Sequence, residues 1–374
     1  MTSWKLPAPR HSRLGFSLVE MLAAVTVLVI LLGIIAAVTQ GTTVAVHQAS
    51  GKMSTYAAAR AAFNTITAKL GQATLNTYLD YYGTSSGSAV LSVRTAATAS
   101  TFIPTTYGRV SDLQFIVRQN SDSGLGQEVY FQCPEAYSTT AAYQATQGLL
   151  NACGYYVQYD GNVNYRPTLI VFGGVSTKYR YRLMQAIQPT ELLQIYATSA
   201  SSDATSPGPT SDTTTWLKNI ANTGSGKGAT LAPLALPLAD NIIALVIWPR
   251  ASQELDANII PAPTPLAPNY TYDSQASVSP TGTPPSQLLT ANQLPPIVQV
   301  TMVAIDEASA TRLSATATPP AAPTIIETAL SGKFTNVANY STDLSALEAS
   351  LAANHIEFEV LNSTVVMRES KWSQ

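Results

Sequence analysis

An apolar run of 24 residues near the N-terminus constrains this 374-residue chain more than any other feature. The run covers residues 16–39, FSLVEMLAAVTVLVILLGIIAAVT, and carries no charge beyond Glu20. At 1.5 Å per residue, a helix of this length crosses a hydrocarbon layer of about 30 Å. Three basic residues, Lys5, Arg10 and Arg13, precede the run. They predict that the N-terminus stays in the cytoplasm and that everything after the helix lies outside.

Glu20 shows that a plain membrane anchor does not fully explain this run. An ionised carboxylate inside a bilayer helix costs about 2.5 to 3.5 kcal/mol on insertion scales. No Lys or Arg follows within the next two helical turns, so the helix itself offers the carboxylate no partner. We therefore expect the partner to come from another chain, or from a positive group that processing of the N-terminus creates.

The segment around Glu20 resembles a known processing motif. Residues 15–20, GFSLVE, follow a short basic leader and open the apolar helix. They are similar to the prepilin cleavage and methylation motif of type IV pilins and type II secretion pseudopilins. The resemblance implies that a prepilin peptidase cleaves between Gly15 and Phe16 and that the new amine of Phe16 is methylated. It also implies that Glu20 neutralises this amine on a neighbouring subunit during assembly, and such a pair costs less to bury than either charge alone.

The composition predicts an exported protein with no nucleic-acid partner. Charged residues make up 11% of the chain, against roughly a quarter in ordinary domains. Loss of residues 1–15 would leave 17 basic and 22 acidic residues, a net charge of −5. No basic stripe remains to neutralise phosphates. The expected partners are other pilin or pseudopilin subunits, the prepilin peptidase and the inner membrane, which the chain crosses once with its C-terminal domain in the periplasm before it joins a filament.

Two cysteines, Cys133 and Cys153, permit one disulfide and are too few for a four-Cys zinc site. Cys133 ends a predicted strand over 127–132, and Cys153 begins another over 154–159. If these strands pair as a hairpin, the two sulfurs meet. We predict a disulfide in an exported domain, with two buried thiols as the alternative.

The helical pattern continues past the membrane run to about Leu75 without any Pro. Apolar and long side chains recur at steps of three and four residues, which predicts an amphipathic helix with one face to bury. The stripe consists of Met53, Tyr56, Ala57, Arg60, Phe63, Ile66 and Leu70. We divide the chain into a leader (1–15), the transmembrane half of the helix (16–39), an amphipathic spine (40–78) and a β-rich globular domain (79–374).

The globular domain is predicted to be antiparallel sheet, so that the fold class is α+β, a pilin-like long helix packed on a sheet. Strands are expected at 89–94, 113–118, 127–132, 154–159, 178–184, 241–248, 296–305, 355–360 and 363–368. Asn362-Ser363 predicts a tight hairpin between the last two, and a short helix is expected over 343–354. Segments near 198–214 and 261–290 are rich in Pro, Ser and Thr and predict long surface loops.

We predict no catalytic residues, no cofactor and no metal site. His355, next to Glu357 and Glu359, has no accompanying nucleophile motif and is interpreted as a surface histidine. The carboxylates of Asp240, Asp273 and Asp306 are isolated in the sequence and form no calcium loop. We interpret them as solvated surface groups, with a contribution to a calcium site as the alternative. An enzyme carried on a pilin anchor is therefore the weakest hypothesis.

The leading hypothesis is a minor pilin or pseudopilin that is assembled at or near the tip of a type IV pilus-like or type II secretion filament. The segments NIIALVIWPR, PIVQVTMVAIDEASATRL and VVMRESKW resemble the J-type minor pseudopilins and protein C of the Verrucomicrobial pilin-like cassettes. The alternative is a filament-tip adhesin or substrate-binding module that uses the two long loops.

Overall fold

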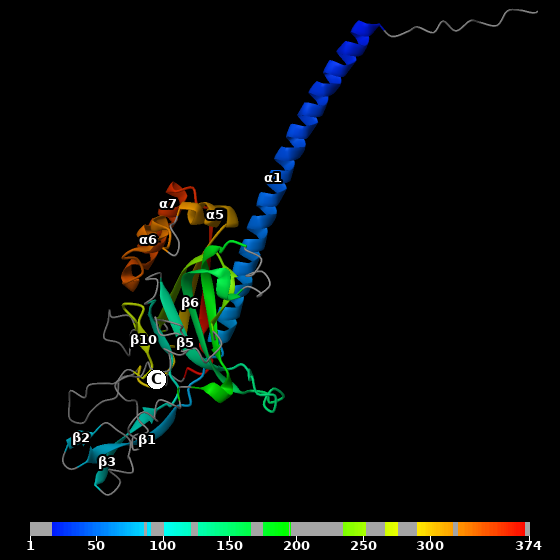
Figure 1. Cartoon of the computed structure of the whole chain (residues 1–374). Coiled ribbons are helices and arrows are strands. Elements are labelled where there is room, and N and C mark those ends of the chain that lie inside the picture. Colours follow the sequence, from blue (N-terminus) through cyan, green and yellow to red (C-terminus); the bar gives the residue numbers. More distant parts are fainter. Residues whose placement is uncertain are drawn as a thin grey trace, which may run out of the picture. The chain divides into compact units, whose positions relative to one another are not determined.

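In the computed structural model, the chain divides into two units, Met1–Gly51 and Lys52–Gln374. The described residues are 17–85, 88–90, 101–120, 126–165, 175–193, 195, 235–251, 266–275, 290–316 and 321–370. Helix α1 (Leu18–Leu70) begins in the first unit and ends in the second (Figure 1). Each unit is described by itself below.

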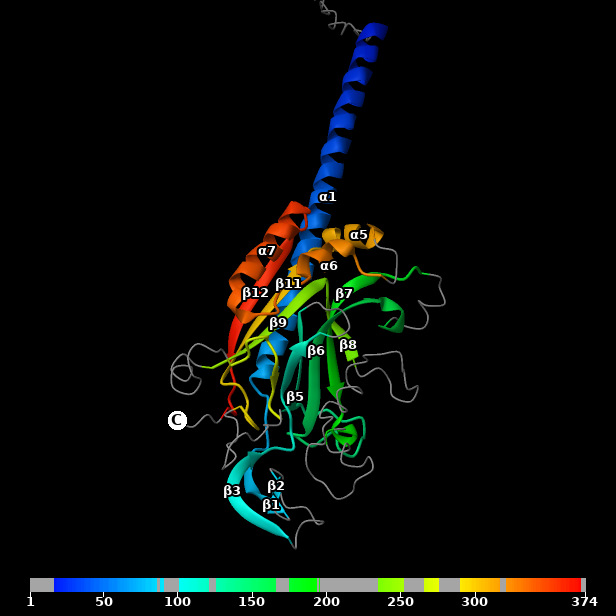
Figure 2. The ribbon, with the colours of Figure 1, turned by 90° about the vertical axis from the view of Figure 1, so that its left-hand side faces the viewer.

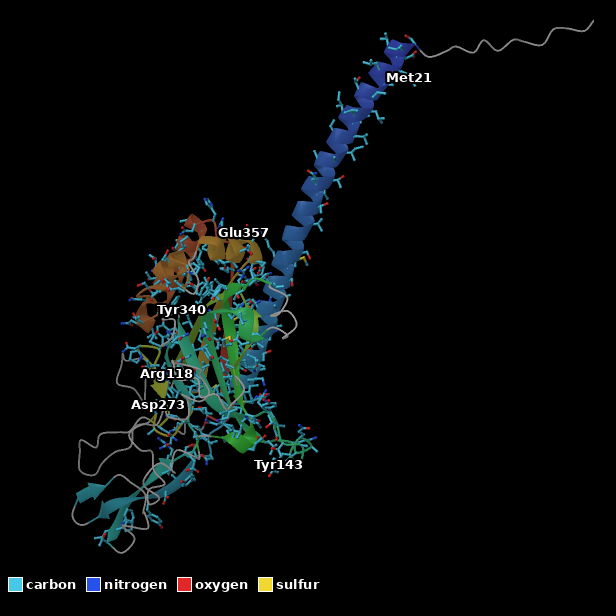
Figure 3. The ribbon with its side chains drawn as sticks, viewed as in Figure 1. Met21, Arg118, Tyr143, Asp273, Tyr340 and Glu357 are labelled. Atoms are coloured by element: carbon cyan, nitrogen blue, oxygen red, sulfur yellow. The ribbon has the colours of Figure 1, made fainter. Side chains whose placement is uncertain are left out.

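In the first unit, α1 exposes apolar side chains along its length. The stretch Leu18–Thr43 has a mean hydropathy of 3.0, and none of its most apolar window is buried. Met21, for example, is 65% exposed (Figure 3). The hydroxyls of Thr26 and Thr39 donate to helix carbonyls three and four residues earlier, at 2.8 Å, so they need no outside partner. This half of α1 is therefore long and apolar enough to cross a membrane.

In the second unit, α1 buries one narrow face. Its members are at most 6% exposed and are Ala59, Ala62, Phe63, Ile66 and Leu70. The predicted buried stripe of the helix is correct for Phe63, Ile66 and Leu70. It is wrong for Met53, Ala57 and Arg60, which are exposed. The true face is centred on two alanines, whose small side chains let the sheet approach the helix. The helix also ends at Leu70 instead of about Leu75.

The second unit, residues 52–374, is called the body below. Its largest described part is a six-stranded antiparallel sheet in the order β10-β4-β5-β6-β7-β8. Its strands are β4 (Ile116–Gln119), β5 (Gln127–Pro134), β6 (Leu150–Gly161), β7 (Tyr179–Gln188), β8 (Ala235–Asp240) and β10 (Tyr272–Asp273). The predicted loop over 261–290 is thus wrong at β10, which pairs with β4 and buries Tyr272. The predicted loop near 198–214 lies entirely outside the described residues, as do residues 261–265 and 276–289 of the other predicted loop.

A three-stranded antiparallel sheet, β12-β11-β9, packs beside the larger one (Figure 2). Its strands are β9 (Ile242–Arg250), β11 (Ile297–Ile305) and β12 (Phe358–Val366). Asn241, with a left-handed φ of 64°, separates β8 from β9 and turns the chain from one sheet into the other.

A further small sheet, β2-β1-β3, follows α1 in the chain and lies at the opposite end of the body from the short helices (Figures 1 and 2). Its strands are β1 (Tyr78–Ser85), β2 (Ser88–Val90) and β3 (Phe102–Val110). The short helices between β11 and β12 are α5 (Glu307–Thr316), α6 (Thr324–Leu330), η5 (Val337–Asn339) and α7 (Tyr340–Ala353), and two further 3₁₀ turns are η1 (Asn162–Tyr165) and η2 (Thr190–Leu192).

The predicted hairpin at Asn362-Ser363 is wrong, because β12 is one nine-residue strand. Thr301 of β11 pairs with Asn362, and Val300 pairs with Ser363. Two-residue hairpins favour positive φ at both turn residues, which Asn-Gly supplies and Asn-Ser does not. The unbroken edge of β11 instead offers ladder hydrogen bonds along the whole segment. The α+β class and the pairing of helix with antiparallel sheet are as predicted.

Gly126 joins the two larger sheets at a point with no room for a side chain. It forms a parallel bridge with Leu245, has a φ of +80°, and a Cβ there would lie 2.3 Å from the Leu245 carbonyl oxygen. Gly148 has a similar φ of +74° but open space around it. Substitutions at these two glycines therefore distinguish the free-energy cost of a side chain at a left-handed φ from the cost of a steric clash.

We expect Gly126→Ala to lower the free energy of unfolding by about 2 to 5 kcal/mol, because strain of about 1 to 2 kcal/mol adds to overpacking of about 1 to 3. Gly148→Ala should cost only about 1 to 2 kcal/mol. Urea unfolding of the chain in detergent, followed by tryptophan fluorescence, measures both. Equal losses in the two variants would contradict the close approach at Leu245.

Candidate functional site

Glu20 lies in the first turn of α1, and its side chain is exposed. The Ser17 carbonyl accepts hydrogen bonds from the backbone nitrogens of Glu20 (3.0 Å) and Met21 (3.1 Å), which starts the helix. The carboxylate therefore sits at the positive end of the helix dipole. Among the described residues, no hydrogen bond or ion pair reaches it. Gly15 and Phe16 lie outside the described residues, so the cleaved bond remains a prediction.

Ion pairs connect the second half of α1 to the body. The Lys52 ammonium lies 3.0 Å from Glu357 Oε1, and Arg60 Nη2 lies 2.8 Å from Glu359 Oε1. Both glutamates flank or begin β12. A third pair joins the Lys69 ammonium, in the last turn of α1, to Glu135 just after β5. The helix is thus fastened to two sheets that lie far from it in the sequence.

The two cysteines are brought together as predicted, by an antiparallel β5–β6 pairing. Phe131 pairs with Cys153 and Cys133 pairs with Asn151, so the cysteines are diagonal neighbours on one face. Their sulfurs lie 3.1 Å apart, both residues are 0% exposed, and both are free thiols in this structure. The disulfide itself is taken up below.

Glu135 completes a group of three donors that lie within 4.8 Å of one another. Its carboxylate is already neutralised by Lys69. The hydrogen bond that the Cys133 thiol shares with Cys153, together with burial, raises the pKa of Cys133, so this thiol stays protonated at neutral pH. Because a metal binds thiolate, the folded cluster is poorly prepared for one, and we assign no metal to it.

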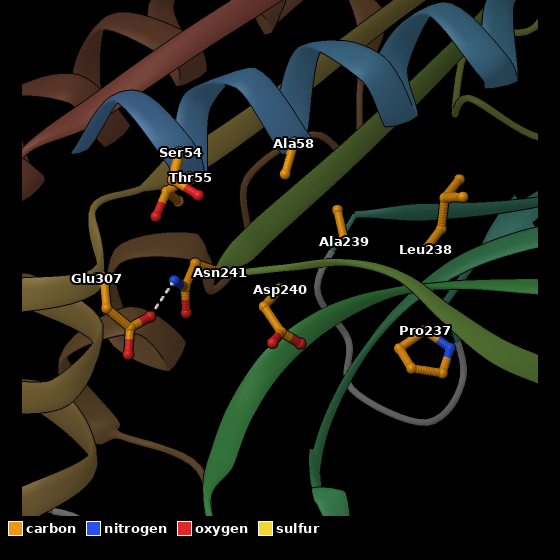
Figure 4. Close-up of a pocket in the computed structure, with 9 residues that line it drawn as sticks. All are labelled: Ser54, Thr55, Ala58, Pro237, Leu238, Ala239, Asp240, Asn241 and Glu307. Atoms are coloured by element: carbon orange, nitrogen blue, oxygen red, sulfur yellow. Dashed lines mark hydrogen bonds between the residues drawn. The ribbon is translucent and has the colours of Figure 1, made fainter. Parts of the chain in front are cut away.

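A pocket of ≈ 360 Å³ lies between the second half of α1 and the β8–β9 corner (Figure 4). Its lining consists of Ser54, Thr55, Ala58, Pro237, Leu238, Ala239, Asp240, Asn241 and Glu307. The lining contains no histidine and no cysteine. The polar side chains of the lining are two carboxylates, one amide and the hydroxyls of Ser54 and Thr55.

Both carboxylates of this pocket are paired with arginines of β7. Arg182 Nε donates to Asp240 Oδ1 at 2.8 Å, and Arg180 Nη2 donates to Glu307 Oε1 at 3.0 Å. Burial by itself would raise the pKa of Glu307, but hydrogen bonds from Asn241 and Arg180 outweigh it, so the pKa is lowered. Glu307 is therefore ionised at neutral pH and is not arranged as a proton donor.

The other acids and the histidine considered in the sequence take structural positions. Asp306 Oδ1 accepts from the Ser309 backbone nitrogen at 3.0 Å and caps α5, while Asp273 Oδ1 accepts from Gln114 Nε2 at 2.8 Å. Burial raises the pKa of Asp273. His355 is exposed, with a φ of 53°, in the turn after α7; the strand expected from 355 begins only at Phe358.

Comparison with known families assigns the N-terminal segment. Residues 10–36 match the family model of the prokaryotic N-terminal methylation motif, a range that contains Gly15, Phe16 and Glu20. The match supports a type IV pilin-like protein that a prepilin peptidase processes and that is anchored in a membrane near its N-terminus. Proteins of this class are structural subunits that assemble with other pilins. No curated protein and no solved structure matches the chain.

The ion pairs of α1 differ in how much water reaches them. The Lys69 and Glu135 side chains are 18% and 15% exposed, whereas Arg60 is 67% exposed. We expect Lys69→Met to destabilise the body by about 3 kcal/mol, because it leaves the Glu135 carboxylate buried without a partner. Arg60→Met should cost at most about 1 kcal/mol. Urea unfolding in detergent measures both.

A second substitution tests the cause of the Lys69 effect. Adding Glu135→Met to Lys69→Met removes the orphaned carboxylate and should recover most of the loss. A double variant as unstable as the single one would show that the lysine stabilises α1 through its methylene contacts instead.

Proposed function

We propose that this chain is a minor pilin or pseudopilin that is processed after Gly15, held in the inner membrane by α1 and assembled at or near the tip of a type IV pilus-like or type II secretion filament. The observation that carries the proposal is an apolar helix over Leu18–Thr43 that no described residue covers. Glu20 lies in its first turn, and the methylation motif over residues 10–36 includes the first part of the helix. Such a surface requires lipid before assembly and other apolar helices after it.

Glu20 gives this proposal its chemistry. A carboxylate in an apolar helix needs a cation, and the described part of the chain supplies none. Cleavage after Gly15 would create an amine at Phe16. The Glu20 carboxylate of one subunit and the Phe16 amine of another then neutralise each other, which lowers the cost of transferring both from water. The body, residues 52–374, is the periplasmic part in this arrangement.

A position near the tip is favoured by size and by resemblance. The second unit is bulky for a subunit repeated at every turn of a thin filament, and steric room is greatest at an end. The C-terminal segments are similar to J-type minor pseudopilins and to protein C of the Verrucomicrobial pilin-like cassettes, which implies a low-copy subunit. The type of filament remains open between a pilus and a secretion system.

A second candidate, a binding module at the filament tip, is favoured by one feature of the small β1–β3 sheet. Large apolar side chains stand in water there: Leu79 is 70% exposed, Ile103 63%, Tyr81 46% and Tyr78 41%. Exposed apolar groups gathered on one small sheet are typical of a surface that contacts another molecule. Deletion of this sheet with normal filament assembly but lost attachment would favour this candidate.

Gly15→Val and Glu20→Leu should separate processing from assembly. A side chain at position 15 obstructs the peptidase, so Gly15→Val should keep the full precursor mass. Glu20→Leu improves the membrane segment by about 2.5 to 3.5 kcal/mol, so the chain should insert and be processed. It should then fail to enter filaments, because the Phe16 amine loses its partner. Filaments sheared from cells and immunoblots of the membrane pellet measure both steps.

Two control variants sharpen this test. Glu20→Gln keeps the shape of the side chain and should also fail to assemble, while Glu369→Leu removes an exposed acid of the body and should assemble normally. Normal incorporation of both Glu20 variants would show that this carboxylate is not the assembly contact, and it would weaken the filament proposal more than any other result.

A further inference from the structure

The sulfurs of Cys133 and Cys153 lie in contact inside a part of the body that closes over them. They are 3.1 Å apart on neighbouring strands, and a covalent S–S bond of about 2.05 Å requires only a local adjustment of the side chains. Neither residue is exposed to solvent at all. The chain therefore holds a ready pair of thiols at a place that a small oxidant does not reach.

The end of α1 forms the cover over this pair. Glu135 Oε1 lies 3.6 Å from Cys133 Sγ, and the other oxygen of Glu135 pairs with Lys69 in the last turn of α1. Just beyond the helix, the Thr74 backbone nitrogen donates to the Gln132 carbonyl at 2.9 Å, next to Cys133. On the sheet, Phe131 lies directly opposite Cys153 in the register, and its ring stacks on that of Tyr155, two residues further along β6, with centroids 6.2 Å apart.

We propose that Cys133 and Cys153 form a disulfide after export, and that this bond forms before the end of α1 packs on the β5–β6 hairpin. The oxidising compartment rests on the proposed function; the order of the two events rests on the geometry of the body alone. The fold then shields the finished bond from reductants, as it would shield the thiols from oxidants.

The chemistry needs space that the folded body does not provide. One thiol loses its proton and the thiolate attacks a small disulfide R–S–S–R, which forms a mixed disulfide and releases R–S⁻. The second thiol, after losing its proton, attacks the mixed disulfide and releases the other R–S⁻. In total, two thiols lose two protons and two electrons, and R–S–S–R becomes two R–SH. The intermediate must hold an R–S group against a sulfur that is fully buried.

The protonation state acts in the same direction. The thiolate is the attacking species, and in the folded body the hydrogen bond with Cys153 and burial raise the pKa of Cys133. In the unfolded hairpin water surrounds both thiols, and neither burial nor this hydrogen bond acts on Cys133. Unfolded chain is therefore the reactive form on both counts.

The first experiment reads the state of the thiols in cells. The full-length chain is expressed, trapped at lysis with acid, denatured with N-ethylmaleimide and weighed by intact mass spectrometry. We expect no maleimide before reduction and two after it. Two maleimides on a mature-mass chain without reduction would overturn the disulfide while leaving the proposed function intact. A chain that still carries residues 1–15 would instead argue against the proposed function.

The second experiment tests the order with purified full-length chain in detergent. The protein is reduced in urea, refolded and then exposed to oxidised glutathione with or without urea. Because oxidation must wait for opening of the body, the folded chain should oxidise at least about 100-fold more slowly than the unfolded chain. Equal rates would overturn the order. Cys133→Ala, with one thiol left, is the control and should take up one glutathione in urea only.

The same order can be tested if the reduced chain does not refold. A reduced chain that fails to regain its far-ultraviolet circular dichroism supports the proposal, because the bond is then needed before the fold. The oxidised chain is in that case treated with dithiothreitol, which should reduce the bond at least about 100-fold more slowly without urea than with it. Reduction at the same rate in both conditions would overturn the shielding of the bond.

Discussion

One helix has to bury apolar side chains in two different surroundings, and the rest of the structure follows from this requirement. In the second unit, Phe63, Ile66 and Leu70 each gain about 1.5 to 3 kcal/mol by leaving water. An exposed ion pair such as that of Arg60 contributes at most about 1 kcal/mol. Apolar contact therefore determines which face of α1 meets the sheet, and the ion pairs refine its position along the sheet. In the first unit no described residue covers the apolar side chains of the helix, and lipid or other subunits are the cover in the function that we propose.

Parts of the fold could be predicted because their residues carry a local signal. The strands β5, β6, β9 and β11 are runs of β-branched and aromatic residues, and the membrane half of α1 is an unbroken apolar stretch. β8 was missed because it contains Pro237, which is uncommon inside a sheet and is tolerated here at its edge. Helix α5 was not predicted, although the sequence carries a start signal for it. That signal is Asp306, whose side chain caps the helix by accepting from the Ser309 backbone nitrogen.

In the candidate site, too, the features set by neighbouring residues in the sequence could be predicted, and those set by distant residues could not. Glu20 could be found because its neighbours in the sequence define its surroundings. The contact of Cys133 with Cys153 could be predicted because both border strands of one hairpin. The ion pair of Arg60 with Glu359 could not be predicted, because the two residues are 299 positions apart in the sequence. They meet only once the strands have paired in register and the sheets have packed on α1. The alanine-centred buried face of α1 was not predicted, because the periodic pattern was read mainly from large side chains and gave little weight to Ala59 and Ala62.

The use of charge in the body explains why Glu20 is exceptional. In the described part of the chain, basic residues of α1 and β7 are matched with acids, as in the pairs of Lys69 with Glu135 and Arg182 with Asp240. Acids without such a pair either lie on the surface of the body, as Glu369 does, or accept hydrogen bonds from protein groups, as the buried Asp306 does from the Ser309 backbone nitrogen. Once α1 is in an apolar surrounding, Glu20 has neither water around it nor a basic partner on its own helix, because the nearest basic residue further along the helix is Lys52. In the function that we propose, its charge is balanced by a group that another molecule brings, and this need makes the anchoring helix an assembling one as well.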